Sequence, residues 1–82
     1  MLRKRYYLHE GKRRAPKGAL TDPKKADRDK TYTVWEKHPH KDAWMIMRSF
    51  PGIYFRPGTE GTEYIRSPKH VVMPQGKDPN GR

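Results

Sequence analysis

Hydrophobic residues are concentrated in the second part of the chain, where every Ile, Val, Trp and Phe lies between residues 31 and 82. Residues 31–38 combine β-branched and aromatic side chains and end before Pro39, which is typical of a strand. Shorter runs at 52–56, 62–66 and 71–73 are separated by Gly and Pro residues. The pattern therefore predicts several short strands joined by turns.

Residues 42–50 fit two secondary structures. Asp42 can cap a helix that ends at Pro51-Gly52, so a short helix of two turns is one reading. The other reading is a strand, since Ala43, Met45 and Met47 alternate with the side chains between them. The strand is favoured because turns flank the segment and strands are its neighbours.

These elements predict a mostly β fold, either a small antiparallel sheet or an SH3-like barrel of four to five short strands. Residues 63–74 resemble the closing segment of SH3-like barrels, in which a strand, a 3₁₀ turn and a short Val-rich strand follow one another. The resemblance implies a barrel shape and carries no function. The predicted core consists of Trp35, Trp44, Ile46, Ile53, Phe55, Ile65 and Val71.

Charge divides the chain differently from hydrophobicity. Residues 1–30 hold 11 of the 19 Lys and Arg, and the whole chain has a formal charge of +10. We expect a basic arm and linker over 1–30, a small β module over 31–74, and a disordered tail over 75–82. Residues 5–9 are a further possible strand inside the arm.

An arm of this kind predicts binding to a polyanion, with nucleic acid, RNA or DNA, as the leading partner. Several aromatic residues lie beside basic residues. On the predicted strands, Tyr54 would share a face with Arg56, and Tyr64 with Arg66. Such faces suggest stacking on unpaired bases. The expected function is a non-enzymatic, nucleic-acid-binding component or accessory of a larger nucleoprotein assembly, such as a ribonucleoprotein. The candidate contact residues are Arg3, Lys4, Arg5, Tyr6, Tyr7, Lys12, Arg13, Arg14, Lys17, Arg56 and Arg66.

The alternative function is a protein–protein interaction module, for example a phage-encoded regulator or assembly protein. In that case the sheet edge or an exposed surface with Trp44, Met45 and Met47 would capture a partner. The basic arm would then dock on an acidic surface of that partner.

Other classes of function have little support in the sequence. The chain has no cysteine. Two His and a carboxylate, His38, His40 and Asp42, could ligate zinc or iron, but Pro39 separates the two rings and no further cluster of ligands follows. No catalytic motif, cofactor or metal site is expected, and no apolar run reaches the length of a membrane span. We expect an intracellular protein of the cytoplasm or nucleoid, with the mitochondrial matrix as an alternative.

Overall fold

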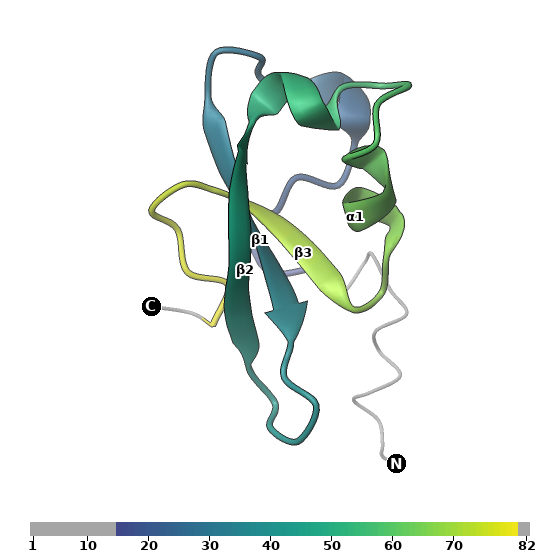
Figure 1. The fold of residues 1–82 in the computed structure, drawn as a ribbon. Coiled ribbons are helices and arrows are strands. Elements are labelled where there is room, and N and C mark those ends of the chain that lie inside the picture. Colours follow the sequence, from purple (N-terminus) through teal and green to yellow (C-terminus); the bar gives the residue numbers. More distant parts are fainter. Residues whose placement is uncertain (1–14, 81–82) are drawn as a thin grey trace.

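The computed structural model describes residues 15–80, which form a three-stranded antiparallel sheet with the strand order β2-β1-β3. Figure 1 shows the sheet with the short helical elements beside it. In chain order, the elements are the 3₁₀ turn η3 (Pro23–Lys25), β1 (Thr31–Lys37), β2 (Trp44–Pro51), the 3₁₀ turn η4 (Gly52–Phe55), α1 (Thr62–Arg66) and β3 (His70–Pro74).

The central strand β1 pairs with both other strands. Val34 lies opposite Arg48 of β2 and Val72 of β3, and the ladder between β1 and β2 is interrupted by a bulge after Val34. The strands predicted at 31–38 and 71–73 are confirmed. Residues 42–50 adopt the strand that the sequence favoured, because a hairpin brings them against the free edge of β1 and satisfies their backbone groups there.

Two of the predicted strands are wrong. Residues 52–56 form the turn η4 and residues 62–66 form α1. A strand would send Tyr54 and Phe55 to opposite faces of the sheet. The helical turn instead lets Phe55 enter the core, where its ring contacts the ring of Phe50 in β2. In α1, the buried residues Thr62 and Ile65 are three positions apart, which places them on one face of a helix, whereas a strand would send them to opposite faces.

The sheet is open, so the fold is a small antiparallel sheet and not a barrel within residues 15–80. Because two of the predicted strands are helical, too few strands remain to close a barrel. The segment that resembles the end of an SH3-like barrel keeps its final Val-rich strand, β3, but begins with a helix.

The core lies between one face of the sheet and the η4–α1 segment. Phe55, Ile65 and Val71 are buried as predicted, but Trp35 and Trp44 are only partly covered and Ile46 and Ile53 are exposed. The buried hydrophobic residues are Ala26, Tyr32, Val34, Phe55, Ile65, Val71, Val72 and Met73. Hydrophobicity therefore identified only part of the core, because burial depends on which strand the helical segment covers.

Residues 15–30 belong to the fold, in contrast to the linker that their composition suggests. Ala26 is only 3% exposed, the Leu20 N–H donates to the Val72 carbonyl at 2.8 Å, and the Asp27 N–H donates to the Tyr32 hydroxyl at 2.9 Å. The predicted boundary at residue 30 therefore falls inside the packed structure. The possible strand at 5–9 lies outside the described residues.

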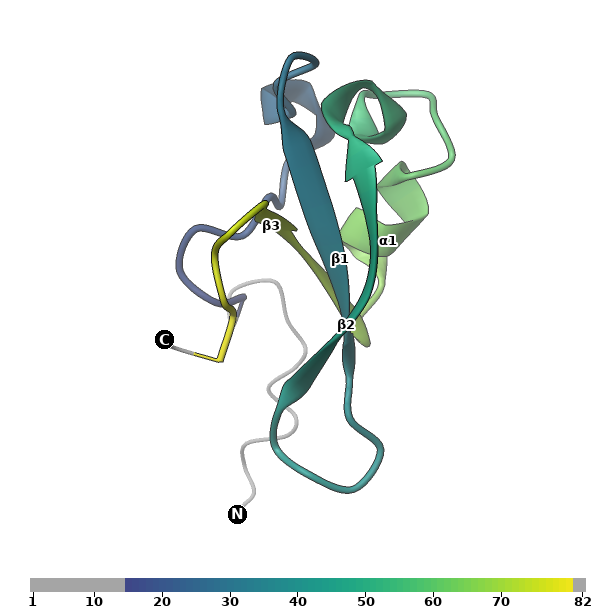
Figure 2. The same cartoon turned by 60° about the vertical axis from the view of Figure 1, so that its left-hand side comes forward.

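The start of the predicted disordered tail is also ordered. The Gln75 N–H donates to the Thr31 carbonyl at 3.0 Å, and the side chain of Asn80 bonds to the backbone of Trp44. Figure 2 shows the segments before η3 and after β3 on the side of the sheet away from α1. Local hydrogen bonds replace the apolar contacts that this segment lacks.

Candidate nucleic-acid interface

Three aromatic rings from three different elements form a row, which we call the aromatic row: Tyr54 of η4, Phe50 of β2 and Tyr64 of α1. Phe50 stacks on Tyr54 with ring centroids 4.2 Å apart and an angle of 14° between the planes. On Tyr64, the centroid distance is 6.0 Å and the angle 24°. All three side chains are half-buried and pack against the core, so the row is both a cover for the core and a partly exposed aromatic surface.

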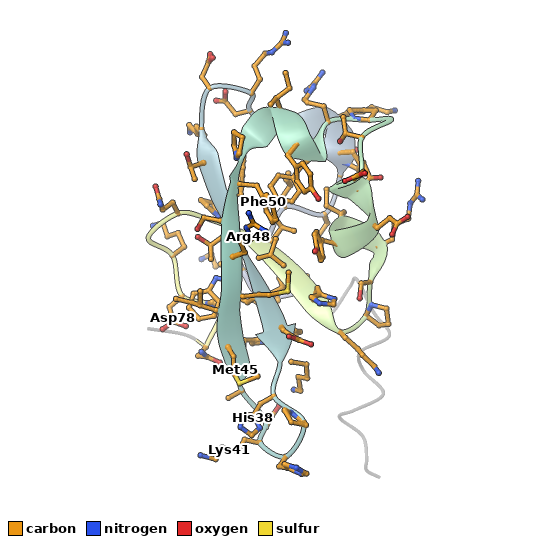
Figure 3. All side chains as sticks on the ribbon, viewed as in Figure 1. His38, Lys41, Met45, Arg48, Phe50 and Asp78 are labelled. Atoms are coloured by element: carbon orange, nitrogen blue, oxygen red, sulfur yellow. The ribbon has the colours of Figure 1, made fainter. Side chains whose placement is uncertain are left out.

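A cation lies beside this row. The Arg48 guanidinium carbon is 5.3 Å from the Phe50 ring centroid, a distance suitable for a cation–π contact. Arg48 is exposed, and no carboxylate among residues 15–80 forms an ion pair with it. Figure 3 shows Arg48 and Phe50 together on β2, with Met45 further along the strand toward the hairpin.

The local sequence explains how the row is assembled. Phe50 ends β2, and the bend at Pro51-Gly52 starts a helical turn that places Tyr54 over Phe50. The Gly61 N–H then donates to the Tyr54 carbonyl at 3.0 Å. A β-carbon at Gly61 would collide with that carbonyl oxygen, so glycine allows the start of α1 to approach η4 closely and brings Tyr64 to the row.

Burial and a neighbouring carboxylate alter the acid–base behaviour of Tyr54. Partial burial raises the pKa of its hydroxyl above 10.0, and the nearby Glu60 carboxylate, which also shares a hydrogen bond with the hydroxyl, raises this pKa further. Tyr54 therefore stays protonated at neutral pH and presents a neutral aromatic ring with a polar edge.

Most of the cations that the structure describes are not neutralised by a carboxylate. Lys37 and Asp42 form the one ion pair within residues 15–80, at 2.7 Å. Carboxylates elsewhere bond to the backbone instead: Asp22 accepts from the Lys24 N–H, and Asp27 accepts from the Asp29 N–H. These acidic residues stabilise turns, and the ammonium groups around them remain available to an anionic partner.

The candidate residues from the sequence have different positions. Lys17 lies in an exposed turn, and Arg66 is exposed at the end of α1. Arg56 has a structural position, because its Nη1 donates to the carbonyls of Lys24 at 2.9 Å and Ala26 at 3.0 Å. Outside the described residues lie Arg3, Lys4, Arg5, Tyr6, Tyr7, Lys12, Arg13 and Arg14.

Sequence reasoning missed Arg48 and Phe50. It expected Tyr54 to share a face with Arg56, and Tyr64 with Arg66, on two separate strands. The structure instead brings Tyr54 and Tyr64 together around Phe50, with Arg48 as the adjacent cation. The spacing of Arg48 and Phe50, two positions apart in a strand, was the sequence pattern that could have identified them.

The histidines of the β1–β2 loop form a turn. Nδ1 of His38 accepts from the N–H groups of His40 and Lys41, both at 3.0 Å. Within residues 15–80, no group of three or more His, Asp or Glu side chains has the arrangement of a metal site. Near β3, the Ser67 hydroxyl is 2.8 Å from Nδ1 of His70 and accepts from the Lys69 N–H, which is the bonding of a turn.

Comparisons with protein-family models, with curated proteins and with solved structures found no match for this chain. In the part of the chain that the structure describes, no helix is both long enough and apolar enough to cross a membrane. The residues of the aromatic row and their surrounding charges are therefore the basis for assigning a function.

Proposed function

We propose that this protein is a non-enzymatic nucleic-acid-binding component or accessory of a larger nucleoprotein assembly. The basic residues of the arm contact phosphates, and the aromatic row stacks on unpaired bases. The observation that carries the proposal is the aromatic row with Arg48 beside it and no ion-pair partner among the described residues. Stacking on aromatic side chains together with phosphate neutralisation is the usual way to bind single strands.

The charge distribution supports a division of work between the two parts. Residues 1–14 hold six Lys and Arg against one acidic residue, whereas the 12 Lys and Arg of residues 15–80 face eight acidic residues. Each phosphate contact releases a counterion, so the arm supplies salt-sensitive affinity that does not depend on sequence. The folded part supplies a preference for single strands, because a base must be unstacked to reach the row.

The experiment is a binding titration of the full chain against mixed-sequence single-stranded RNA and DNA and against duplex DNA, at several salt concentrations. We expect tighter binding to the single strands near 50 mM salt and a steep loss of affinity as salt is added. Replacement of the six bases of residues 1–14 by Gln should lower the slope of log K against log salt by about 4, at roughly 0.7 per phosphate contact.

Arg48→Ala tests the role of the folded part. It should weaken single-strand binding several-fold and reduce the slope by about 0.7. Lys41→Ala is the matched control, because it removes one positive charge from the distant end of the β1–β2 hairpin (Figure 3). Absence of binding near 50 mM salt would contradict the proposed function. Equal effects of the two variants would show that the aromatic row has no part in it.

A further inference from the structure

The outer edge of β2 is open within the described part of the chain. β2 pairs only with β1, while the opposite edge of the sheet, on β3, receives the Leu20 N–H at the Val72 carbonyl, 2.8 Å away. Edge strands present backbone groups that can pair with another chain, and proteins usually protect them. Within residues 15–80, a backbone group bonds to the outer edge of β3, whereas no backbone group bonds to the outer edge of β2.

Asn80 shows which backbone groups of β2 point outward. Its Oδ1 accepts from the Trp44 N–H at 2.8 Å, and its Nδ2 donates to the Trp44 carbonyl at 3.1 Å. This is the pair of bonds that a residue of an added strand would make, here formed by a side-chain amide. The outer edge of β2 therefore already accepts an amide at its first residue.

The ladder fixes the remaining outward groups. Trp44 lies opposite Lys37 and Ile46 lies opposite Trp35, so Ile46 has the same orientation as Trp44 two residues earlier. Beyond the bulge, Val34 pairs with Arg48, which turns Ser49 outward. Ile46 and Ser49 thus offer their N–H and carbonyl groups to a further strand.

The side chains along this edge are apolar and exposed. Ile46 is 66% exposed, Met45 39% and Met47 37%. Arg48 is the one charged residue of β2, and the whole chain carries +10. A second copy of this chain would bring like charges together, whereas a partner with carboxylates would be attracted to the same surface.

We propose that the outer edge of β2, from Ile46 to Ser49, binds an extended segment of a partner protein that alternates apolar and acidic residues. The segment adds a strand to the sheet, with backbone hydrogen bonds at Ile46 and Ser49. Ile46 lies opposite Trp35 and Arg48 opposite Val34, so one face of the segment makes apolar contacts to Ile46 and the other places a carboxylate near Arg48. Asn80 marks the end of the binding edge at Trp44. This interaction goes beyond nucleic-acid binding and does not depend on it.

The test uses the full chain labelled for NMR and a short acetylated peptide of alternating valine and glutamate. We expect the amide protons of Ile46 and Ser49 to shift downfield and to exchange at least tenfold more slowly when the peptide is present. A peptide methylated on the backbone nitrogens of one edge should lose this effect, since it cannot donate to β2. A peptide with lysine in place of glutamate should bind several-fold more weakly.

Ser49→Pro removes one outward N–H and leaves the backbone ladder to β1 in place, because proline is tolerated at such edge positions. It also removes the bond between the Ser49 and Thr33 hydroxyls, which are 2.8 Å apart. It should abolish the protection of Ile46 by the peptide while the amides of β1 keep theirs. Ile53→Lys is the control, since Ile53 is also exposed, at 47%, but lies outside β2. If Ser49→Pro does not fold, the methylated peptide with the unaltered protein still decides the question.

Two results would overturn the proposal. One is unchanged exchange at Ile46 and Ser49 with millimolar peptide, or equal binding of the methylated peptide. The other is protection of the same two amides by single-stranded DNA in competition with the peptide, which would assign this edge to nucleic acid. Loss of nucleic-acid binding in the salt titration would leave the peptide result unaffected, so the two proposals fail separately.

Discussion

The two outer strands of the sheet have similar hydrophobic sequences and opposite surroundings. In β3, Val71, Val72 and Met73 are between 1% and 6% exposed, whereas Met45, Ile46 and Met47 of β2 are between 37% and 66% exposed. Both strands pair with β1. The difference shows that burial in this small protein follows from what covers a strand and not from how apolar the strand is.

The chain covers β3 from several directions. α1 packs against β3, and on the other face of the sheet the Met73 side chain lies near Gly18 of the segment before η3. β2 receives cover mainly at its end, where Phe50 meets η4 and α1. The rest of β2 remains available as a surface.

The largest expected effect compares one methionine on each outer strand. Met73→Ala removes a side chain that is 2% exposed and should cost about 2–5 kcal/mol of unfolding free energy. Met45→Ala, at a position that is 39% exposed, should cost at most about 0.5 kcal/mol, as surface changes do. Urea denaturation of both variants measures the difference, and equal losses would show that β2 is buried in solution.

The next effect tests how closely α1 packs on η4, through two glycines of the segment that joins them. Gly61→Ala places a methyl group against the Tyr54 carbonyl and the Phe55 ring and should destabilise the protein by about 1–3 kcal/mol. Gly58→Ala meets no atom within 4 Å but has a φ of +86°, for which about 1 kcal/mol is expected. Thermal melts of both variants show which substitution lowers the stability more. A smaller loss for Gly61→Ala would mean that α1 does not pack closely on η4.

A smaller effect is expected at the one point where the chain protects the outer edge of β2. Asn80→Ala removes both bonds to Trp44 and should cost about 1 kcal/mol, because the site is exposed to water. The amide proton of Trp44 should also exchange faster with solvent, because it loses the acceptor that protects it. Asn80→Asp keeps the acceptor but loses the donor, so its effect on stability and exchange should be intermediate. Unchanged amide exchange at Trp44 in both variants would show that Asn80 does not bond to this edge of β2.

The smallest effect concerns Tyr54 of η4, which stacks on Phe50 at the end of β2. Its pKa in the folded state lies above 10.0, so the folded protein holds this proton more tightly than the unfolded chain. The resulting stability is present below pH 10 and is lost as the pH rises through the folded pKa. Tyr54→Phe should therefore lose less stability than the unaltered protein between pH 9 and pH 11 in denaturant titrations. Parallel curves would contradict the shift.

The sequence predicted the elements whose pattern has one reading. β1 has β-branched and aromatic residues over its whole length, and β3 has the Val-rich run that only a strand explained. It failed at Ile53 and Tyr64, because segments of five residues fit a strand and a helical turn equally well. It also failed at Ala26 and Leu20, whose polar neighbours resemble a linker although both residues pack on the core.

The candidate interface was also predicted only in part from the sequence. Counting charges was enough to predict a polyanion as the partner and to choose the bases of the arm. No local pattern indicated that Tyr54, Tyr64 and Phe50 would stack beside Arg48, because these residues come from three elements. Arg56, which the sequence predicted to act with Tyr54, instead bonds to the backbone carbonyls of Lys24 and Ala26.

The sequence by itself determined the charge of this protein, its central strand and the small size of its core, since these depend on composition and on local preference. Only the tertiary structure decided which of two equally apolar strands is buried. The reason is physical: hydrophobic residues gain free energy wherever they leave water, and the choice between β2 and β3 depends on where a glycine-containing connection of fixed length can place α1 and η4.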